Sequence, residues 1–114
     1  MFSRKYRITN SADFDYLFQK GYLRSNSLFY LKFLPNKLSY SRFGFVVGVK
    51  LFKEAVKRNR VKRLMREFVR SNLTKIRGGY DIVVGVKSRK FYGIKYEEAE
   101  KLLSAFFDNN NFLE

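Results

Sequence analysis

The sequence predicts a single mixed α+β domain that spans residues 1–114. Apolar side chains recur with the 3.6-residue period of a helix in three segments, at 11–20, 53–72 and 95–108. Residues that favour strands fill three others, at 27–34, 42–49 and 80–86. A chain of 114 residues, 46% of them hydrophobic, can bury one modest core. We expect the ends, at about 1–8 and 109–114, to be flexible.

The segment 11–20 carries the signals of a short amphipathic helix. Asn10 or Ser11 can accept hydrogen bonds from the free amides of its first turn, and Gly21 stands where a glycine often ends a helix. Three apolar side chains share one face: Phe14, Leu17 and Phe18. Leu17 is expected in the core, whereas the two phenylalanines fit either a core position or the edge of a cleft.

The two strands that follow alternate between faces. In 27–34, one face carries Phe29, Leu31 and Phe33, and the other carries Tyr30 and Lys32 with two leucines. In 42–49, one face carries bulky residues and the other carries Gly44, Val46 and Gly48, continued by Lys50. Glycines within a strand often mark the close approach of another group. This face is either a floor for an extended polyanion or a seat for a closely packed helix.

The segment 53–72 predicts a helix with one apolar side and one cationic side. The apolar side chains are Val61, Leu64, Met65 and Phe68. The opposite side carries Asn59, Arg63, Arg66 and Arg70, flanked by Arg60 and Lys62. Like charges four residues apart each destabilise a helix by roughly 0.2–0.5 kcal/mol. Such a face indicates contact with a polyanion; the alternative is a charged face that only solvent covers.

The last part of the chain predicts a strand and a structural helix. The strand at 80–86 follows the basic helix, so it can pair in parallel with 42–49 as a βαβ unit. The helix at 95–108 has a regular apolar stripe, and the glutamates near its start favour its dipole. Neither feature suggests a binding site.

The net charge indicates the kind of partner, and the residue types that the chain lacks exclude several kinds of active site. The formal net charge is +14 and the pI is near 10.2, which favours a nucleic-acid or anionic-membrane partner. The chain has no Cys and no His, which excludes disulfides, thiolate nucleophiles and histidine bases. Its carboxylates show no paired acid–base spacing or metal-ligand spacing. No apolar run could span a membrane, and no secretory signal is apparent.

The run from Arg58 to Arg66, Arg-Asn-Arg-Val-Lys-Arg-Leu-Met-Arg, resembles the "RNR" motif of the bacterial ribonuclease P protein subunit. The resemblance covers roughly residues 4–107. Its further matches are Arg7, Phe14, Phe18, Gly21, the run Arg42-Phe43-Gly44, Lys50 and the pair Ala55-Val56.

The resemblance implies a two-layer α/β sandwich in the order αβββαβα. It adds a short strand near 22–26 and a left-handed βαβ crossover, although generic rules favour the right-handed form. It also implies that an RNA subunit carries the catalytic centre and its Mg²⁺ ions, so no protein residue is catalytic and none is expected to bind metal. The partners implied are ribonuclease P RNA and the 5′ leader of precursor tRNA, in the bacterial cytoplasm. No membrane and no obligate protein partner are expected.

Two groups of site residues follow by position in the sequence. We expect contact with the catalytic RNA from Arg58, Asn59, Arg60, Lys62, Arg63, Arg66 and Arg70. We expect contact with the leader from Arg7, Phe14, Phe18, Tyr30, Lys32 and Lys50.

Three positions depart from the family pattern and bear on the leader cleft. Lys32 stands where many members have an aromatic residue, and Tyr30 on the same face can substitute for it. Val49 precedes Lys50 where many members have two lysines, and Lys53 stands where many have glycine.

Three functions are therefore compared. The first is the protein subunit of a ribonucleoprotein endonuclease that matures tRNA 5′ ends. The second is an RNA-binding module without enzymatic role, such as a ribosomal or assembly protein. The third is a protein-only nuclease, which the missing histidines and acidic clusters disfavour.

Overall fold

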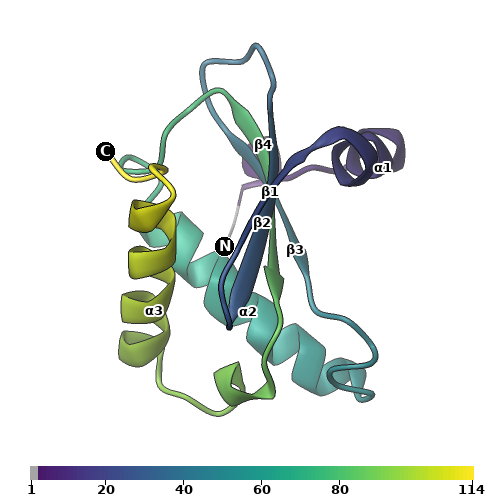
Figure 1. The fold of residues 1–114 in the computed structure, drawn as a ribbon, viewed down its shortest axis with the longest axis vertical. Helices are drawn as coiled ribbons and strands as arrows, with labels where there is room; N and C mark the ends of the chain where they lie inside the picture. Colours follow the sequence, from purple (N-terminus) through teal and green to yellow (C-terminus); the bar gives the residue numbers. More distant parts are fainter. Residues whose placement is uncertain (1–2) are drawn as a thin grey trace.

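The computed structural model describes residues 3–114 and contains seven regular elements and two short 3₁₀ turns (Figure 1). In chain order these are η1 (Arg4–Tyr6), α1 (Ser11–Lys20), β1 (Tyr22–Ser25), β2 (Phe29–Pro35), β3 (Arg42–Val46), α2 (Ala55–Ser71), β4 (Tyr80–Val86), η2 (Arg89–Phe91) and α3 (Tyr96–Asn109). The predicted α+β order αβββαβα is confirmed, including the short strand β1.

The strands form one sheet in the order β1-β2-β4-β3. β3 pairs in parallel with β4, and the other neighbours are antiparallel. β3, α2 and β4 thus form the predicted βαβ unit; its left-handed crossover stays a prediction. Side chains of α2 and α3 share one core with one face of the sheet, and α1 lies against the other face (Figure 1).

The core confirms the predicted apolar faces of α2 and α3. The sheet contributes Phe29, Leu31, Ile82 and Val84, all buried. α2 contributes Val61, Met65 and Phe68, while Leu64 is half-buried at the rim. The stripe of α3 supplies Ala99, Leu103, Phe106 and Phe107.

The strand predicted at 42–49 ends at Val46, so part of that prediction is wrong. Val46 pairs with Gly85, one residue before β4 itself ends, and the ladder has no partner beyond it. Val47 then turns into the core with 5% of its surface exposed. The Gly48 carbonyl accepts hydrogen bonds from the amides of Leu51 and Phe52. Gly48 and Lys50 therefore belong to a turn and do not extend the sheet face.

α1 begins and ends where its sequence signals predicted, but the reason for a glycine at its C-terminal end differs from the expected one. The Asn10 Oδ1 accepts from the amide of Ala12 at 2.8 Å, as a cap should. Gly21 ends the helix in an extended conformation, with φ of −67°. A Cβ at Gly21 would lie 2.5 Å from the Leu17 carbonyl oxygen. Close approach, rather than a left-handed backbone, is what requires glycine there.

Both ends of the described chain make contacts with the domain, and their flexibility stays a prediction. The amide of Ile8 donates to the Phe43 carbonyl at 2.9 Å, which places residues 7–8 along the free edge of β3. At the other end Phe112 is 3% exposed, and its carbonyl accepts from the Arg77 amide at 2.9 Å. Of the segment 1–8, residues 1–2 lie outside the described part.

A bidentate ion pair between Arg42 and Asp81 ties β3 to β4. The Nε–Oδ1 and Nη2–Oδ2 distances are 2.9 and 2.6 Å, and the two side chains are 25% and 15% exposed. Asp13 of α1 lies 3.7 Å from the same guanidinium, and Asn36 donates to Asp81 at 2.9 Å. The hydrogen bond to Asp81 is the main cause that raises the pKa of Arg42. This network fixes the N-terminal end of α1 relative to the sheet.

We predict that Asp81→Ala lowers the free energy of unfolding by about 2–3 kcal/mol, because the half-buried Arg42 guanidinium then keeps only its longer contact with Asp13. Urea unfolding measures the effect. Glu54→Ala is the control, since it removes an exposed pair with Lys57 and should leave stability essentially unchanged. Equal stability of both variants would show that the Arg42 network does not hold the fold.

Candidate nucleic-acid interface

On the outer face of the sheet the strand register aligns side chains in rows, and two of these rows lie beyond the Arg42–Asp81 pair. One row runs Leu23, Lys32, Val83 and Gly44 across β1, β2, β4 and β3. The next runs Ser25, Tyr30, Gly85 and Val46. The alternation predicted for β2 is confirmed, because Phe29 and Leu31 are buried on the opposite face.

Two glycines on this face are covered by aromatic rings. A Cβ at Gly44 would lie 2.6 Å from Cε2 of Phe14, so the ring of Phe14 sits directly on the strand. A Cβ at Gly85 would lie 2.0 Å from ring atoms of Tyr30. At Gly44 the alternative of a closely packed helix is therefore correct, while Gly48 lies beyond the end of β3 and is not part of this face.

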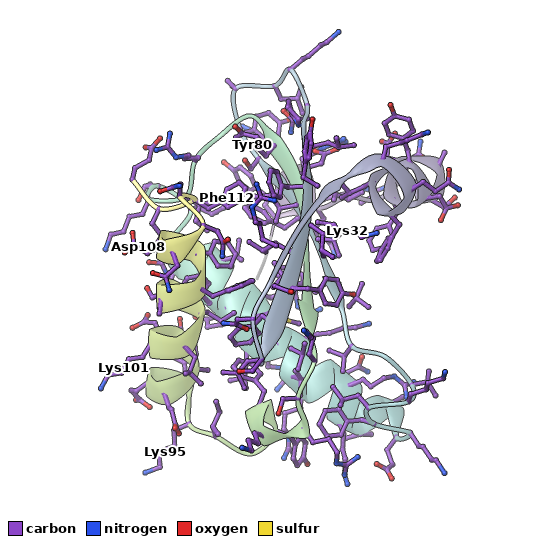
Figure 2. The ribbon with its side chains drawn as sticks, viewed as in Figure 1. Lys32, Tyr80, Lys95, Lys101, Asp108 and Phe112 are labelled. Atoms are coloured by element: carbon purple, nitrogen blue, oxygen red, sulfur yellow. The ribbon has the colours of Figure 1, made fainter. Side chains whose placement is uncertain are left out.

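A groove of about 310 Å³ lies on this face beside the C-terminal half of α1. Its lining consists of Phe18, Leu23, Ser25, Tyr30, Lys32 and Lys87. Lys32 lies between the sheet and α1 (Figure 2). Its ammonium is 5.2 Å from the ring centroid of Phe18 and donates to the Phe18 carbonyl. Burial raises the pKa of the Tyr30 hydroxyl above its ordinary value. Aromatic rings beside two ammonium groups suit stacked bases and their phosphates.

The structure brings together only some of the residues predicted to bind a leader. One groove is lined by Phe18, Tyr30 and Lys32. Phe14, on the same face of α1 as Phe18, packs against Gly44. Lys50 is exposed in the turn after β3 and does not line the groove. Arg7 lies on the β3 edge, where its charge contributes to lowering the pKa of Arg66 on α2.

Sequence reasoning missed three groove residues. Leu23 and Ser25 come from a strand whose four residues are all exposed, so no alternation of burial marks it. Lys87 directly follows β4 and donates to the Asn26 carbonyl at 2.9 Å. Its position after a central strand was the only signal available.

The other candidate surface is the solvent-facing side of α2. Asn59, Arg60, Arg63 and Arg70 are exposed, whereas Arg58, Lys62 and Arg66 are half-buried. Burial, followed by the charges of Arg63 and Arg7, lowers the pKa of Arg66. Like charges are thus gathered here without enough acids to neutralise them.

The cations of α2 are not equivalent. Arg58 donates to the carbonyls of Phe52 and Lys53 at 2.8 and 2.7 Å, so it also holds the turn that precedes the helix. Arg70 makes a bidentate pair with Glu67. Arg63 has no ion pair within residues 3–114.

A tyrosine extends this surface beyond the helix. The ring centroid of Tyr92 lies 5.5 Å from the Lys57 ammonium and 5.8 Å from the Arg60 guanidinium. The Tyr92 hydroxyl also accepts from Arg60 at 3.4 Å. Tyr92 lies outside the basic motif, and sequence reasoning did not select it.

Within residues 3–114, no three acidic, cysteine or histidine side chains gather as metal ligands would. No helix in that part of the chain is long and apolar enough to cross a bilayer.

Comparisons with known proteins agree on one family. The family model described as Ribonuclease P matches residues 2–110. The ribonuclease P protein component of Fusobacterium nucleatum is 37% identical over 111 residues, covering 93% of this chain and 97% of the relative. The RNase P protein of Staphylococcus aureus superposes with a TM-score of 0.82 at 27% identity, covering 96% and 98% of the two chains. That of Thermotoga maritima gives 0.76 at 36% identity, covering 88% and 94%.

We predict that Arg63→Ala weakens binding to a large folded RNA and lowers the slope of log K against log salt by about one, since each phosphate contact releases counterions. Arg60→Ala should act in the same direction. Arg70→Ala is the matched comparison and should change the slope less, because Glu67 already neutralises much of its charge. Filter binding over a salt series measures all three, and unchanged slopes for Arg60→Ala and Arg63→Ala would contradict an RNA contact on this face.

Proposed function

The chain belongs to the Ribonuclease P family, and we propose that within this tRNA-processing ribonucleoprotein it holds two RNA elements on two separate surfaces. α2 binds the catalytic RNA, and the groove beside α1 binds the 5′ leader of precursor tRNA. The observation that carries the proposal is this groove, where Phe18, Tyr30 and Lys32 meet on the sheet face opposite α2.

The α2 surface has the chemistry expected for a structured RNA. Arginine forks match phosphate geometry, and A-form RNA presents phosphates and shape rather than readable base edges in its deep groove. The unpaired charge of Arg63 and the crowding of Arg66 by Arg63 and Arg7 are unfavourable in the free protein. A phosphate backbone laid along the helix relieves this repulsion, so the charge pattern favours assembly with RNA.

The groove suits an extended single strand. Stacking of a base on an aromatic ring is worth roughly 1–3 kcal/mol, and Phe18 and Tyr30 offer two rings beside the ammonium groups of Lys32 and Lys87. The groove is open to solvent rather than enclosed. We therefore expect binding that depends on the presence of a leader more than on its sequence.

Catalysis in this proposal belongs to the RNA subunit, which carries the Mg²⁺ ions, as the family resemblance implies. The protein contributes by binding: it holds the leader beside the catalytic RNA and adds positive charge to a polyanionic assembly. Extra cations reduce the repulsion between two RNAs, so the protein should matter most when Mg²⁺ is scarce.

Reconstitution tests this function directly. Bacterial ribonuclease P RNA and precursor tRNA are mixed at low Mg²⁺ with and without the protein, and cleavage at the mature 5′ end is followed. We expect faster cleavage with the protein. Cleavage no faster than with RNA alone would leave an RNA-binding module without enzymatic role, and cleavage by the protein alone would indicate a protein-only nuclease.

We predict that Phe18→Ala reduces the affinity of the reconstituted enzyme for precursor tRNA with a leader by about five- to tenfold, from loss of one stacked base. Affinity for mature tRNA should not change. Tyr16→Ala is the matched control on the same helix, because Tyr16 is 60% exposed and does not line the groove. Equal losses on both substrates would assign Phe18 to packing alone.

A further inference from the structure

A second pocket, of about 290 Å³, lies on the other side of β1 from the groove. Two arginines, Arg24 and Arg77, and the asparagines of the segment 109–111 form its polar lining. Neither the proposed leader groove nor the α2 surface includes any of these residues. Its lining is cationic and rich in amides, with no carboxylate side chain.

The floor of this pocket is a packed aromatic cluster. Phe112 lies 4.9 Å from Phe33 and 5.4 Å from Tyr80, measured between ring centroids, with edge-to-face geometry. Tyr80 and Phe112 lie close together between the sheet and the end of α3 (Figure 2). Because Phe112 is buried, the C-terminal segment holds this floor in place.

Both guanidinium groups have donors available for an anion. Arg24 lies 5.5 Å from the ring of Phe33, and its Nη1 donates only to the neighbouring Leu23 carbonyl. The Nε of Arg77 donates a hydrogen bond to the Asn111 carbonyl. Neither arginine has an ion pair within residues 3–114. Two guanidinium groups without carboxylate partners, next to aromatic rings, suit a nucleotide: the arginines can bind its phosphate and the rings can contact its base.

The alternation of β1 connects this pocket to the groove. Leu23 and Ser25 line the groove, whereas Arg24 between them lines the pocket. β1 is an edge strand and all four of its residues are exposed, so nothing in the described domain separates the two sites beyond this strand. A single-stranded RNA that leaves the groove over the β1 edge reaches Arg24 next.

We propose that this pocket binds a phosphate-bearing nucleotide in the upstream part of the leader, after the leader has crossed β1. The inference rests on the proposed function of the groove. Arg24 and Arg77 hold the phosphate, and the base lies toward Phe33 and the asparagine amides. The protein then recognises leader length, since only a leader longer than the groove reaches the second pocket.

The test measures the affinity of the reconstituted enzyme for precursor tRNAs whose leaders are lengthened one nucleotide at a time. For the unmodified protein, affinity should rise in two stages. Arg24→Ala should remove the second stage, about a three- to fivefold loss for long leaders, as expected for one exposed charge contact. Short leaders and mature tRNA should bind as before. Lys101→Ala removes an exposed charge on α3, away from Phe112 (Figure 2), and should change nothing.

Three outcomes would overturn the inference, and they are distinguishable. Equal loss at every length, mature tRNA included, would assign Arg24 to the RNA subunit or to the tRNA body. A two-stage rise that Arg24→Ala and Arg77→Ala both retain would leave the groove proposal standing and remove only the second pocket. Affinity of the unmodified protein that ignores the leader altogether would remove the groove and the pocket together.

Discussion

The arrangement of the outer sheet face depends on one contact, the packing of the Phe14 ring against Gly44. The core buries the opposite face against α2 and α3, so α1 can pack only on the remaining side. A strand residue without a side chain lets the Phe14 ring approach the backbone, and Asp13 next to it reaches Arg42. α1 is thereby held over β3 at one end, while its other end leaves Tyr30 and Lys32 accessible as a groove.

The charge of the chain is distributed in a way that a free protein would not favour. Arg42 and Arg70 have carboxylate partners, and Arg58 holds backbone carbonyls, so these cations stabilise the fold itself. Arg63 on α2 and Arg24 in β1 have no carboxylate partner within the described residues. The distinction separates arginines that build the structure from arginines that we assign to RNA.

Local periodicity predicted three helices, three strands and most helix faces, whereas the short strand β1, and with it the full element order, came from the family resemblance. The sequence could not predict the end of β3, since that depends on where β4 stops pairing. The resemblance placed Lys50 in the leader cleft, and the predicted strand 42–49 continued the sheet face to that residue, but the strand ends at Val46. Sequence reasoning missed Arg77 and Arg24 as neighbours because folding alone brings two such distant residues to one pocket. The motif found the basic helix, but not the partners that already occupy Arg58 and Arg70.

The separation of two RNA surfaces is tested most directly by side-chain footprinting with hydroxyl radicals. Val56, 72% exposed near the start of α2, reports on one surface, while Phe18 and Tyr30 report on the groove. We expect catalytic RNA alone to protect Val56 and leave the groove aromatics reactive. Precursor tRNA with a leader should then protect Phe18 and Tyr30, and mature tRNA should not. Protection of all three side chains by catalytic RNA alone would contradict the separation.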